Sequence, residues 1–593
     1  MDISIHIKTG IQQAFKALYN HDLSSDPIAL QPTRKEFEGS HTFVTFPYAR
    51  ISKKNPVQTG EDIGNFLLEK TDWLKGFNVV KGFLNLELAD KVWLDILNDI
   101  LNTSNYGYAE KNGEKVMVEY SSPNTNKPLH LGHLRNNFLG YSISKILEAN
   151  GYEVMKVNLV NDRGIHICKS MLAYQKFGEG ETPESADIKG DHLIGKYYVV
   201  FDKEYKKEIA ELIEKGHTEE EAKKNALLIL EAQEMLKKWE EGDEEVVSLW
   251  KKMNEWVYQG FDQTYKQMGV SFDKMYKESD TYLLGKDIVE EGLEKGVFYK
   301  KEDNSVWADL SAEKLDHKLV LRGNGTSVYI TQDMGTCDLK YEDLPFTKSV
   351  YVVGNEQDHH FNVLFSIMKK LGRPYGEGLY HLSYGMVDLP SGKMKSREGT
   401  VVDADDLMEE MIKTAAERVK EKEKIAEFSE EEKKELFRIN GLGALKYFLL
   451  KVDPKRRMLF NPEESVDLNG HTAIFIQYTH ARSSAIIKRA KGLGVEPAIN
   501  NSLALEPAEL ELIALLNEYP EKIQFAGKEY SPSVIAQYAY DLAKSYNRFY
   551  HEVKIFDDDN DEKISMRIAL TAIVKSTISS ALNLLGVDAP ERM

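Results

Sequence analysis

The run Val116-Met117-Val118-Glu119-Tyr120 is a short β-prone stretch, and the polar loop Ser121-Ser122-Pro123-Asn124-Thr125-Asn126-Lys127-Pro128 follows it. We predict a helix from about His130, because apolar residues from Leu134 onward keep helical spacing and Gly151 supplies a stop. A second strand is predicted from Glu153 to Val160. Strand, helix and strand over this distance form a βαβ unit, which implies parallel pairing and a right-handed crossover.

A second unit of this kind lies far downstream. It has a strand from Val350 to Val353, a helix from Phe361 to Lys370 and a strand from Tyr380 to Val387. Two βαβ halves separated in sequence predict an α/β fold with one doubly wound, Rossmann-like parallel sheet. The residues between the halves, at about 178–300, are then an insertion in this sheet.

The insertion has the pattern of amphipathic helices that pack on the sheet. It is rich in Glu and Lys, and Thr218-x-x-Glu221 is a capping-box pattern. An apolar stripe at steps of three and four is formed by Trp250, Met253, Val257, Phe261 and Tyr265. Outside the sheet, residues 1–110 show mixed helix and strand signals, and residues 404–593 are helical throughout. We therefore predict an α+β N-terminal domain at 1–110, a Rossmann-like domain at 111–403 that carries the insertion, and an all-α C-terminal domain at 404–593.

Composition narrows the class of protein. The chain has 593 residues, a formal net charge of −19 and a pI near 5.4. This acidity excludes a general nucleic-acid coat, although it does not exclude nucleic acid held on a local basic surface. Two cysteines without a CxxC motif argue against a disulfide framework and a Cys-type zinc site. No stretch is apolar for long enough to span a bilayer, so we expect a cytoplasmic protein that does not bind membranes.

The sequence His130-Leu131-Gly132-His133 begins the first predicted helix. Two histidines three residues apart could be metal ligands, but no third ligand lies nearby at metal spacing. They could also be structural. Their place directly after the first strand favours a third interpretation, because helix N-termini attract phosphate. Gly132 would let a ligand approach closely, and the imidazoles could donate to developing charge on phosphorus.

A basic loop, Ser391-Gly392-Lys393-Met394-Lys395-Ser396-Arg397-Glu398-Gly399-Thr400, follows the last predicted strand. Alone it would be read as an ordinary exposed turn. Together with the histidine pair at the same carboxyl edge of the sheet, it predicts a clamp for a triphosphate. A P-loop and a well-placed dinucleotide motif are both absent, so neither of those enzyme classes is favoured.

These two elements resemble the HIGH and KMSKS signatures of class I aminoacyl-tRNA synthetases. The surrounding residues resemble the arginyl-tRNA synthetase family, nearly throughout 111–593 and more weakly in the first 110 residues and the insertion. The motifs that carry this resemblance are 118–124 (VEYSSPN), 161–164 (NDRG), 329–333 (YITQD), 354–361 (GNEQDHHF), 477–482 (QYTHAR) and 590–593 (PERM).

The resemblance implies a set of substrate contacts. The ATP-binding positions are His130, Gly132, His133, Gly354, His360, Met386, Val387 and Lys393. The arginine-binding positions are Glu119, Ser121, Asn124, Tyr329, Asp333 and Gln357. Carboxylates such as Glu119 and Asp333 suit this substrate, because a guanidinium pairs best with planar acceptors.

The basic loop departs from the family pattern at one position. Lys393 is kept, but Ser396 stands where the family has a second lysine, and a serine cannot supply that cationic phosphate contact. In family members that lack this lysine, one just before the HIGH sequence takes its place, and Lys127 stands there. Lys395 is the alternative, and the sequence leaves both open. The expected catalytic residues are thus His130, His133, Lys127, Lys393 and Lys395.

The implied reaction has two steps, arginyl-adenylate formation from L-arginine and ATP with Mg²⁺, and transfer to arginine tRNA. The resemblance further implies a first step that needs tRNA, a monomer without a bound structural metal, and an N-terminal domain that contacts tRNA. It also implies that 111–403 is the catalytic domain, and the helices of 404–593 resemble the anticodon-binding domain of this family. Candidate tRNA contacts there are Tyr478, Arg482, Tyr546, Asn547 and Tyr550, although core packing is the simpler interpretation of Tyr546 alone. The competing hypotheses are a non-catalytic tRNA-binding paralogue, another acyl-adenylate-forming enzyme and, least favoured, a zinc hydrolase.

Overall fold

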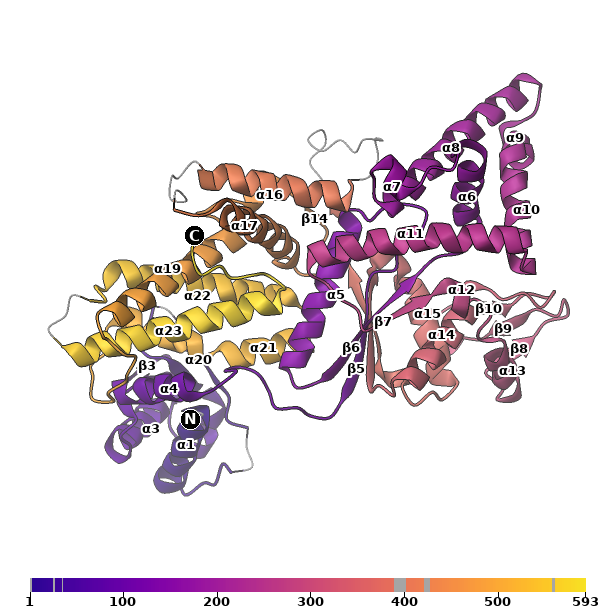
Figure 1. The fold of residues 1–593 in the computed structure, drawn as a ribbon. Helices are drawn as coiled ribbons and strands as arrows, with labels where there is room; N and C mark the ends of the chain where they lie inside the picture. The colour runs from indigo at the N-terminus through magenta and orange to yellow at the C-terminus, as the bar shows by residue number, and fades with distance from the viewer. Residues whose placement is uncertain (1–2, 25–26, 35, 389–401, 421–426, 557–559) are drawn as a thin grey trace.

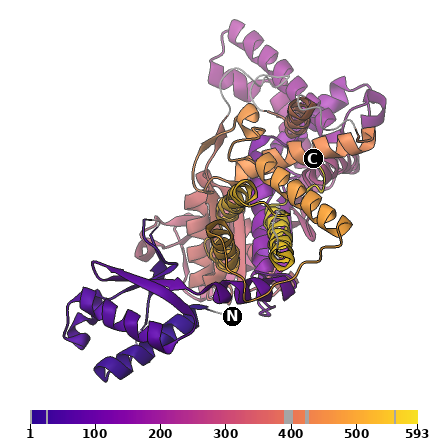
Figure 2. The same cartoon turned by 90° about the vertical axis from the view of Figure 1, so that its left-hand side faces the viewer.

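The computed structural model describes residues 3–24, 27–34, 36–388, 402–420, 427–556 and 560–593. A parallel sheet lies at its centre, with a helical domain on one side and the helical insertion extending away from it (Figure 1). The N-terminal domain lies beneath the C-terminal helices, and the view turned by 90° shows it protruding from the rest of the molecule (Figure 2). The expected α/β, α+β and all-α parts are therefore present.

The central sheet has the strand order β12-β11-β5-β6-β7, and each neighbouring pair is parallel. Its strands are β5 (Lys115–Glu119), β6 (Glu153–Val160), β7 (Lys274–Lys277), β11 (Lys348–Gly354) and β12 (Leu379–Tyr384). Strands from both predicted βαβ halves pair with one another, because β5 lies between β11 and β6. The prediction of one doubly wound sheet is confirmed.

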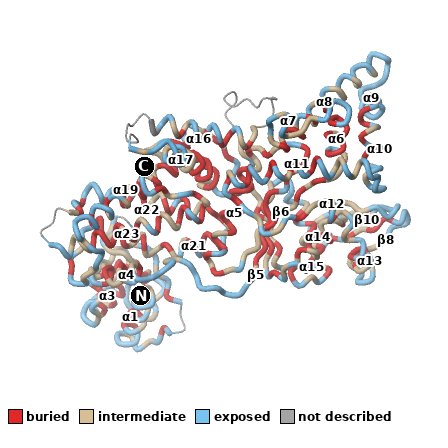
Figure 3. The backbone as a smooth tube through the Cα atoms, in the orientation of Figure 1, coloured by how far each residue is buried: buried red, intermediate tan, exposed pale blue. Residues whose placement is uncertain are grey.

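Helices cover both faces of this sheet. They are α5 (Leu131–Ala149), α6 (Ile165–Phe177), α14 (Tyr329–Asp343) and α15 (Asp358–Lys370). Val116 and Val118 pack in the core that contains α5, whereas Met117 packs in the separate core beneath α14 and α15. Successive strand residues face opposite sides. A strand that is buried on both faces therefore needs an unbroken apolar run, and Figure 3 shows β5 as buried.

The insertion consists of α7 (Pro183–Ala186), α8 (Gly190–Glu214), α9 (Glu219–Asn225), α10 (Leu227–Glu241) and α11 (Glu244–Met268). The predicted capping box is present, with Thr218 and Glu221 each accepting from the other's backbone N–H. Four members of the predicted stripe on α11 are buried, and Trp250 instead donates its indole N–H to the Asp162 carbonyl at 2.6 Å. The predicted range also contains β7, which pairs with β6 in the sheet, so the inserted helices end at Met268, before the predicted limit of about 300.

Between β7 and β11 the chain adds a small antiparallel sheet. This sheet consists of β8 (Phe298–Lys300), β9 (Val306–Ala308) and β10 (Lys318–Leu321). Two helices precede it, α12 (Glu278–Thr281) and α13 (Lys286–Glu294). The strand predicted to reach Val387 ends at Tyr384. Beyond it, β13 (Val387–Asp388) pairs with β14 (Met458–Leu459). A side chain at Gly385 would lie 2.6 Å from the Arg456 backbone carbon, so glycine permits this close crossing.

The N-terminal domain combines helices with an antiparallel sheet of order β1-β2-β4-β3. Its elements are α1 (Ile3–Tyr19), β1 (Leu30–Pro32), β2 (His41–Val44), α2 (Ala49–Ser52), α3 (Pro56–Lys70), β3 (Leu74–Val80), β4 (Phe83–Leu88) and α4 (Asp90–Asn102). The C-terminal helices are α16 (Ala404–Lys420), α17 (Glu430–Leu450), α18 (Pro462–Ser465), α19 (Ala473–Gly492), α20 (Pro507–Asn517), α21 (Tyr519–Lys528), α22 (Pro532–Glu552) and α23 (Asp561–Leu584). Among the described residues, no helix has the length and apolar character needed to cross a membrane.

Candidate active site at the carboxyl edge of the sheet

The two predicted phosphate-binding histidines form the N-terminal cap of α5. His130 is the N-cap residue, and its Nδ1 accepts a hydrogen bond from the backbone N–H of Gly132 at 3.1 Å. His133 completes a capping box, since its Nδ1 accepts from the backbone N–H of His130, also at 3.1 Å. The ring centroids lie 3.9 Å apart. A Cβ atom at Gly132 would lie 3.0 Å from the His130 ring, so glycine leaves room for this cap.

Both histidine rings are held neutral. Burial, together with the nearby Lys127 ammonium, lowers the pKa of His130 to about 4, while Asp403 opposes the change. Burial likewise holds the pKa of His133 well below its usual range, with His130 and Lys127 adding to the effect. In a neutral imidazole, one nitrogen accepts and the other donates. Because Nδ1 accepts in both residues, each ring offers Nε2–H as a donor.

The loop after β5 is fastened to the end of β6. Thr125 donates its backbone N–H to the Asn161 carbonyl, and Asn161 donates to the Pro123 carbonyl. Asn124 forms an isolated parallel bridge with Asn161 and is partly exposed. Lys127 is exposed, and its charge acts on both histidines of the α5 cap. The predicted contacts Asn124 and Lys127 are therefore accessible at the same edge of the sheet.

Ser121 has a different environment from the other predicted arginine contacts. It is fully buried, with a left-handed backbone φ of +64°. Its hydroxyl forms a hydrogen bond with Tyr265 at 2.8 Å and accepts one from Asn137. Its backbone N–H donates to Asn136 at 2.6 Å. In this structure Ser121 shapes the turn after β5 and offers no exposed surface to a substrate.

The two predicted arginine-binding carboxylates lie at the end of β5 and on the facing helix α14. Glu119 is 5% exposed and pairs through Oε2 with the ammonium of Lys340, which is 2% exposed. Asp333 pairs through Oδ2 with Nε2 of His360 at 2.6 Å. Tyr329 begins α14 one turn before Asp333 and is 77% exposed, so it is not the buried strand aromatic that an isolated sequence pattern favours.

The remaining predicted ATP and arginine contacts lie around the end of β11 and the crossing after β12. Gly354 ends β11, and the exposed Gln357 precedes α15, whose first turn contains His360. Met386 is exposed and Val387 begins β13. The site edge is therefore built from the carboxyl ends of neighbouring parallel strands, which is the usual ligand position in such sheets.

Sequence reasoning missed several residues that organise this edge. Arg135 is fully buried and donates to the carbonyls of Gly385 at 2.6 Å, Pro454 at 3.2 Å and Arg456 at 3.0 Å. Lys340 holds Glu119, as described above. Glu278, just after β7, is a third carboxyl near Asp333, and burial raises its pKa. Arg135 stands beside the histidine motif, but neither Lys340 nor Glu278 has a local sequence signal.

The predicted loop contacts Lys393 and Lys395, together with Ser396, lie outside the described residues. The residues that follow them pair with the α5 cap. Leu131 donates its backbone N–H to the Val402 carbonyl, and Ala404 donates to the Leu129 carbonyl, both at 3.0 Å. His130 and Asp403 form the bridge between these bonds. The chain thus returns to the histidine motif directly after the basic loop.

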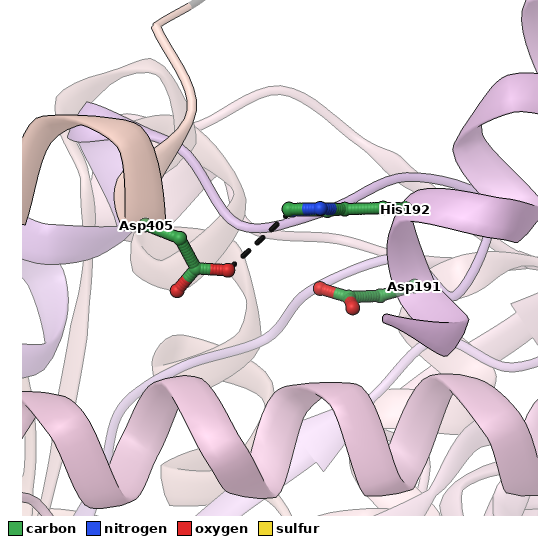
Figure 4. Close-up of side chains that lie close together, drawn as sticks. All are labelled: Asp191, His192 and Asp405. Atoms are coloured by element: carbon green, nitrogen blue, oxygen red, sulfur yellow. Dashed lines mark ion pairs between the residues drawn. The ribbon is translucent and has the colours of Figure 1, made fainter. Parts of the chain in front are cut away.

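A cluster of charged groups fastens this returning segment to the insertion. Asp191 and His192 begin α8, and Asp405 begins α16 (Figure 4). Their ligand atoms lie within 4.8 Å of one another, which is a spacing that could hold a metal ion. The ammonium of Lys189 lies 2.5 Å from Asp405 and 3.5 Å from Asp191, so a cation of the chain itself already neutralises these carboxylates.

Four of the five predicted tRNA contacts form one cluster on α19 and α22. The guanidinium of Arg482 lies 4.9 Å from the Tyr478 ring centroid and 4.7 Å from that of Tyr550. It also donates to Asn547, which in turn donates to Thr479 at 2.9 Å. Tyr546 lies behind the cluster in the helical core and is 0% exposed. It cannot stack on a base unless these helices separate, which agrees with the core-packing interpretation.

Comparison with known proteins identifies the class that this fold and site define. The family described as tRNA synthetases class I (R), catalytic domain, matches residues 95–461, and the DALR anticodon binding domain matches residues 476–593. The structure is also similar to that of the Thermus thermophilus arginyl-tRNA synthetase, with a TM-score of 0.79, 24% identity and 99% of each chain covered. The chain is a class I aminoacyl-tRNA synthetase by family.

Curated relatives narrow the family further. The chain is 54% identical to the arginine–tRNA ligase of Amoebophilus asiaticus and 55% identical to that of Phocaeicola vulgatus, with the whole of each chain covered. A structure from Plasmodium falciparum, also an arginyl-tRNA synthetase, has a TM-score of 0.74 at 20% identity and covers 100% of this chain. The protein belongs to the arginyl-tRNA synthetase family.

Proposed function

We propose that the protein attaches L-arginine to its cognate tRNA through an arginyl-adenylate, with ATP supplied as its Mg²⁺ complex. The observation that carries this proposal is the pair of neutral Nε2–H donors at the N-terminus of α5, placed at the same sheet edge as the carboxylates Glu119 and Asp333. The first group suits phosphate and the second suits a guanidinium. Full-length identity of 54% to a curated arginine–tRNA ligase supports the same reaction.

In the first step, the carboxylate of arginine attacks the α-phosphorus of ATP and pyrophosphate leaves. His130 and His133 would donate through Nε2 to phosphate oxygens, while the helix N-terminus and the Lys127 ammonium stabilise the same negative charge. Mg²⁺ is expected to arrive on the ATP phosphates, since it keeps most of its water and is seldom held by a protein cage alone. Lys393 and Lys395 remain proposed contributors from outside the described residues.

Substrate positioning would use the rest of the sheet edge. Glu119 and Asp333 would accept hydrogen bonds from the guanidinium, with Tyr329 alongside. Asn124 and Gln357 would hold the amino and carboxylate end. Gly354, His360, Met386 and Val387 would hold ATP. Because a site of buried carboxylates rejects side chains that lack a matching cation, no hydrolytic editing site is needed.

In the second step, the 2′-hydroxyl of the terminal adenosine of tRNA attacks the activated carbonyl and AMP leaves. The α19–α22 cluster of Tyr478, Arg482, Asn547 and Tyr550 would contact unpaired tRNA bases by stacking and through the guanidinium. The N-terminal domain would contact another part of the same tRNA.

Arginine-dependent ATP–pyrophosphate exchange tests this proposal, with lysine and glutamine as control amino acids and with tRNA present or absent. Exchange with arginine alone among the three, and only when tRNA is present, is the expected result. Exchange without tRNA would keep the synthetase function and remove its tRNA requirement. Failure to exchange with any amino acid while tRNA still binds would instead identify a non-catalytic tRNA-binding paralogue.

A further inference from the structure

Lys340 is one of the most deeply buried cations of the described chain, and it contacts Glu119, a proposed arginine-binding residue. It lies on α14, it is 2% exposed, and its ammonium forms an ion pair with Oε2 of Glu119. The rings of Tyr276 and Tyr351 lie 5.7 Å and 5.0 Å from this ammonium, measured to their centroids. The mechanism described above makes no use of Lys340.

The ion pair between Lys340 and Glu119 offsets the cost of burying a carboxylate. A carboxylate as buried as Glu119 loses its hydration, and a buried charge without a partner is costly. The Lys340 ammonium supplies the opposite charge inside the protein before any substrate arrives. The tyrosine rings add a favourable field for the cation.

The pair also limits which oxygen of Glu119 can meet a substrate. Lys340 engages Oε2, and among the described residues no hydrogen bond reaches Oε1. Asp333 shows the same arrangement, with Oδ2 engaged by His360 and no described hydrogen bond to Oδ1. Asp333, Cys337 and Lys340 follow each other on one face of α14 at steps of four and three. Each carboxylate is thus fixed through one oxygen and keeps the other for a ligand.

We propose that Lys340 is a positioning residue for recognition of the arginine guanidinium, because it holds the buried Glu119 carboxylate by Oε2 and leaves Oε1 for the substrate. This inference rests on the proposed function and deepens it. The ammonium of Lys340 does not touch the substrate. It acts through Glu119, so its removal changes arginine binding only as long as Glu119 is present.

The test compares Lys340→Met with the wild type and with Lys340→Arg, by ATP–pyrophosphate exchange at neutral pH. Methionine fills similar space without charge, and arginine restores the charge. Loss of one charged hydrogen-bond partner predicts a rise of about tenfold or more in the arginine KM, with the ATP KM little changed. Lys340→Arg should lose less, because it restores a charged donor beside Glu119.

Lys274→Met is the matched control. Lys274 on β7 pairs with Asp343 at 2.5 Å, one turn beyond Lys340 on α14, but both partners are partly exposed. Its removal should leave the arginine KM unchanged. Thermal unfolding of each variant separates misfolding from a change in binding. If Lys340→Met does not fold, two other comparisons test the role of Lys340. One is Lys340→Arg against the wild type, and the other is Glu119→Gln against Glu119→Gln/Lys340→Met.

The double variant gives a second readout. If Lys340 acts through Glu119, Lys340→Met should add little to the rise in arginine KM caused by Glu119→Gln. Additive effects, or a Lys340→Met variant with the wild-type arginine KM, would overturn the role of Lys340 and leave the proposed function intact. A wild-type protein without arginine-dependent exchange would overturn both.

Discussion

His360 donates to Asp333 across 2.6 Å, from Nε2 of the ring to Oδ2 of the carboxylate. The first residue is a proposed ATP contact and the second a proposed arginine contact, so one hydrogen bond joins the two substrate positions. His360→Ala should raise the arginine KM by about tenfold as well as the ATP KM, since Asp333 loses a charge-assisted partner. His360→Gln, which keeps a donor, should lose less. A change in the ATP KM alone would show that this bond is not used.

The low pKa of His130 predicts how stability varies with pH. The folded protein binds a proton at His130 only below a pKa of about 4, whereas the unfolded chain does so below 6.5. Between these values the unfolded state binds more protons, so the free energy of unfolding falls as pH is lowered through this window, by about 3 kcal/mol in total from this group. His133 acts in the same direction.

His130→Asn tests both the stability and the catalytic role. Asparagine can still cap α5, so stability near neutral pH should change little, and the acid-side loss should become shallower. The Nε2–H donor is gone, so the adenylation rate should fall by about a hundredfold. Chemical unfolding at several pH values and pyrophosphate exchange measure the two effects. An unchanged acid slope would contradict the assignment of a neutral His130.

Lys127→Ala tests which lysine supplies the cationic phosphate contact that Ser396 cannot make. Lys127 is exposed and acts on the pKa of both cap histidines, so its removal should slow adenylation steeply and leave the arginine KM nearly unchanged. Stability should stay within about 0.5 kcal/mol of the wild type, as for most surface substitutions. A normal adenylation rate would transfer the role to Lys395, and Lys395→Ala measured in parallel would then show the loss.

Arg482→Ala should weaken tRNA binding, because its guanidinium lies between Tyr478 and Tyr550 on the surface of α19 and α22. Loss of such a stacking group predicts about a tenfold rise in the tRNA KM for aminoacylation. Arginine-dependent exchange at saturating tRNA should be retained. Arg548→Ala is the control, since Arg548 is on α22 but pairs with Glu511 and Glu552. Equal effects of the two substitutions would argue against a specific α19–α22 contact.

Lys189→Met should destabilise the junction between the insertion and the segment that returns to the histidine motif. It leaves Asp405 and the fully buried Asp191 without their ammonium, and a broken pair with so little exposure costs about 3 kcal/mol. Lys196→Met, on α8, removes a partly exposed pair with Glu181, which precedes α7, and should cost less than about 1 kcal/mol. Chemical unfolding compares the two, and similar losses would contradict a structural role of the cluster.

The sheet and the phosphate end of the site were predictable because their signals are local. Val116-Met117-Val118 is apolar on both faces of β5, and HLGH follows it within one loop, so periodicity and order along the chain define the βαβ unit. The helical stripe on α11 was predictable for the same reason. The family resemblance then directed attention to Glu119 and Asp333, which no local pattern distinguishes from ordinary surface carboxylates.

The partners of these residues were not predictable, since they come from distant parts of the chain. Glu119 meets Lys340 only because α14 packs beside β5, and Arg135 meets Pro454 and Arg456 only because the C-terminal helices return to α5. Ser121, predicted to bind arginine, and Tyr546, predicted to contact tRNA, are both fully buried in the structure. The sequence did not distinguish them from the exposed members of the same predicted groups. A single tyrosine at helical spacing has the same sequence signature whether it lines the core or the surface.

Arg135 gives α5 a further property. The histidines at the N-terminus of α5 lie where the triphosphate is proposed to bind. Arg135, on the same helix, donates a hydrogen bond to the carbonyl of Gly385, beside the proposed ATP contacts Met386 and Val387. A single helix therefore sets the spacing between these two groups of proposed ATP contacts. If both groups bind one nucleotide, a nucleotide whose proportions differ from those of ATP would meet one group but not the other.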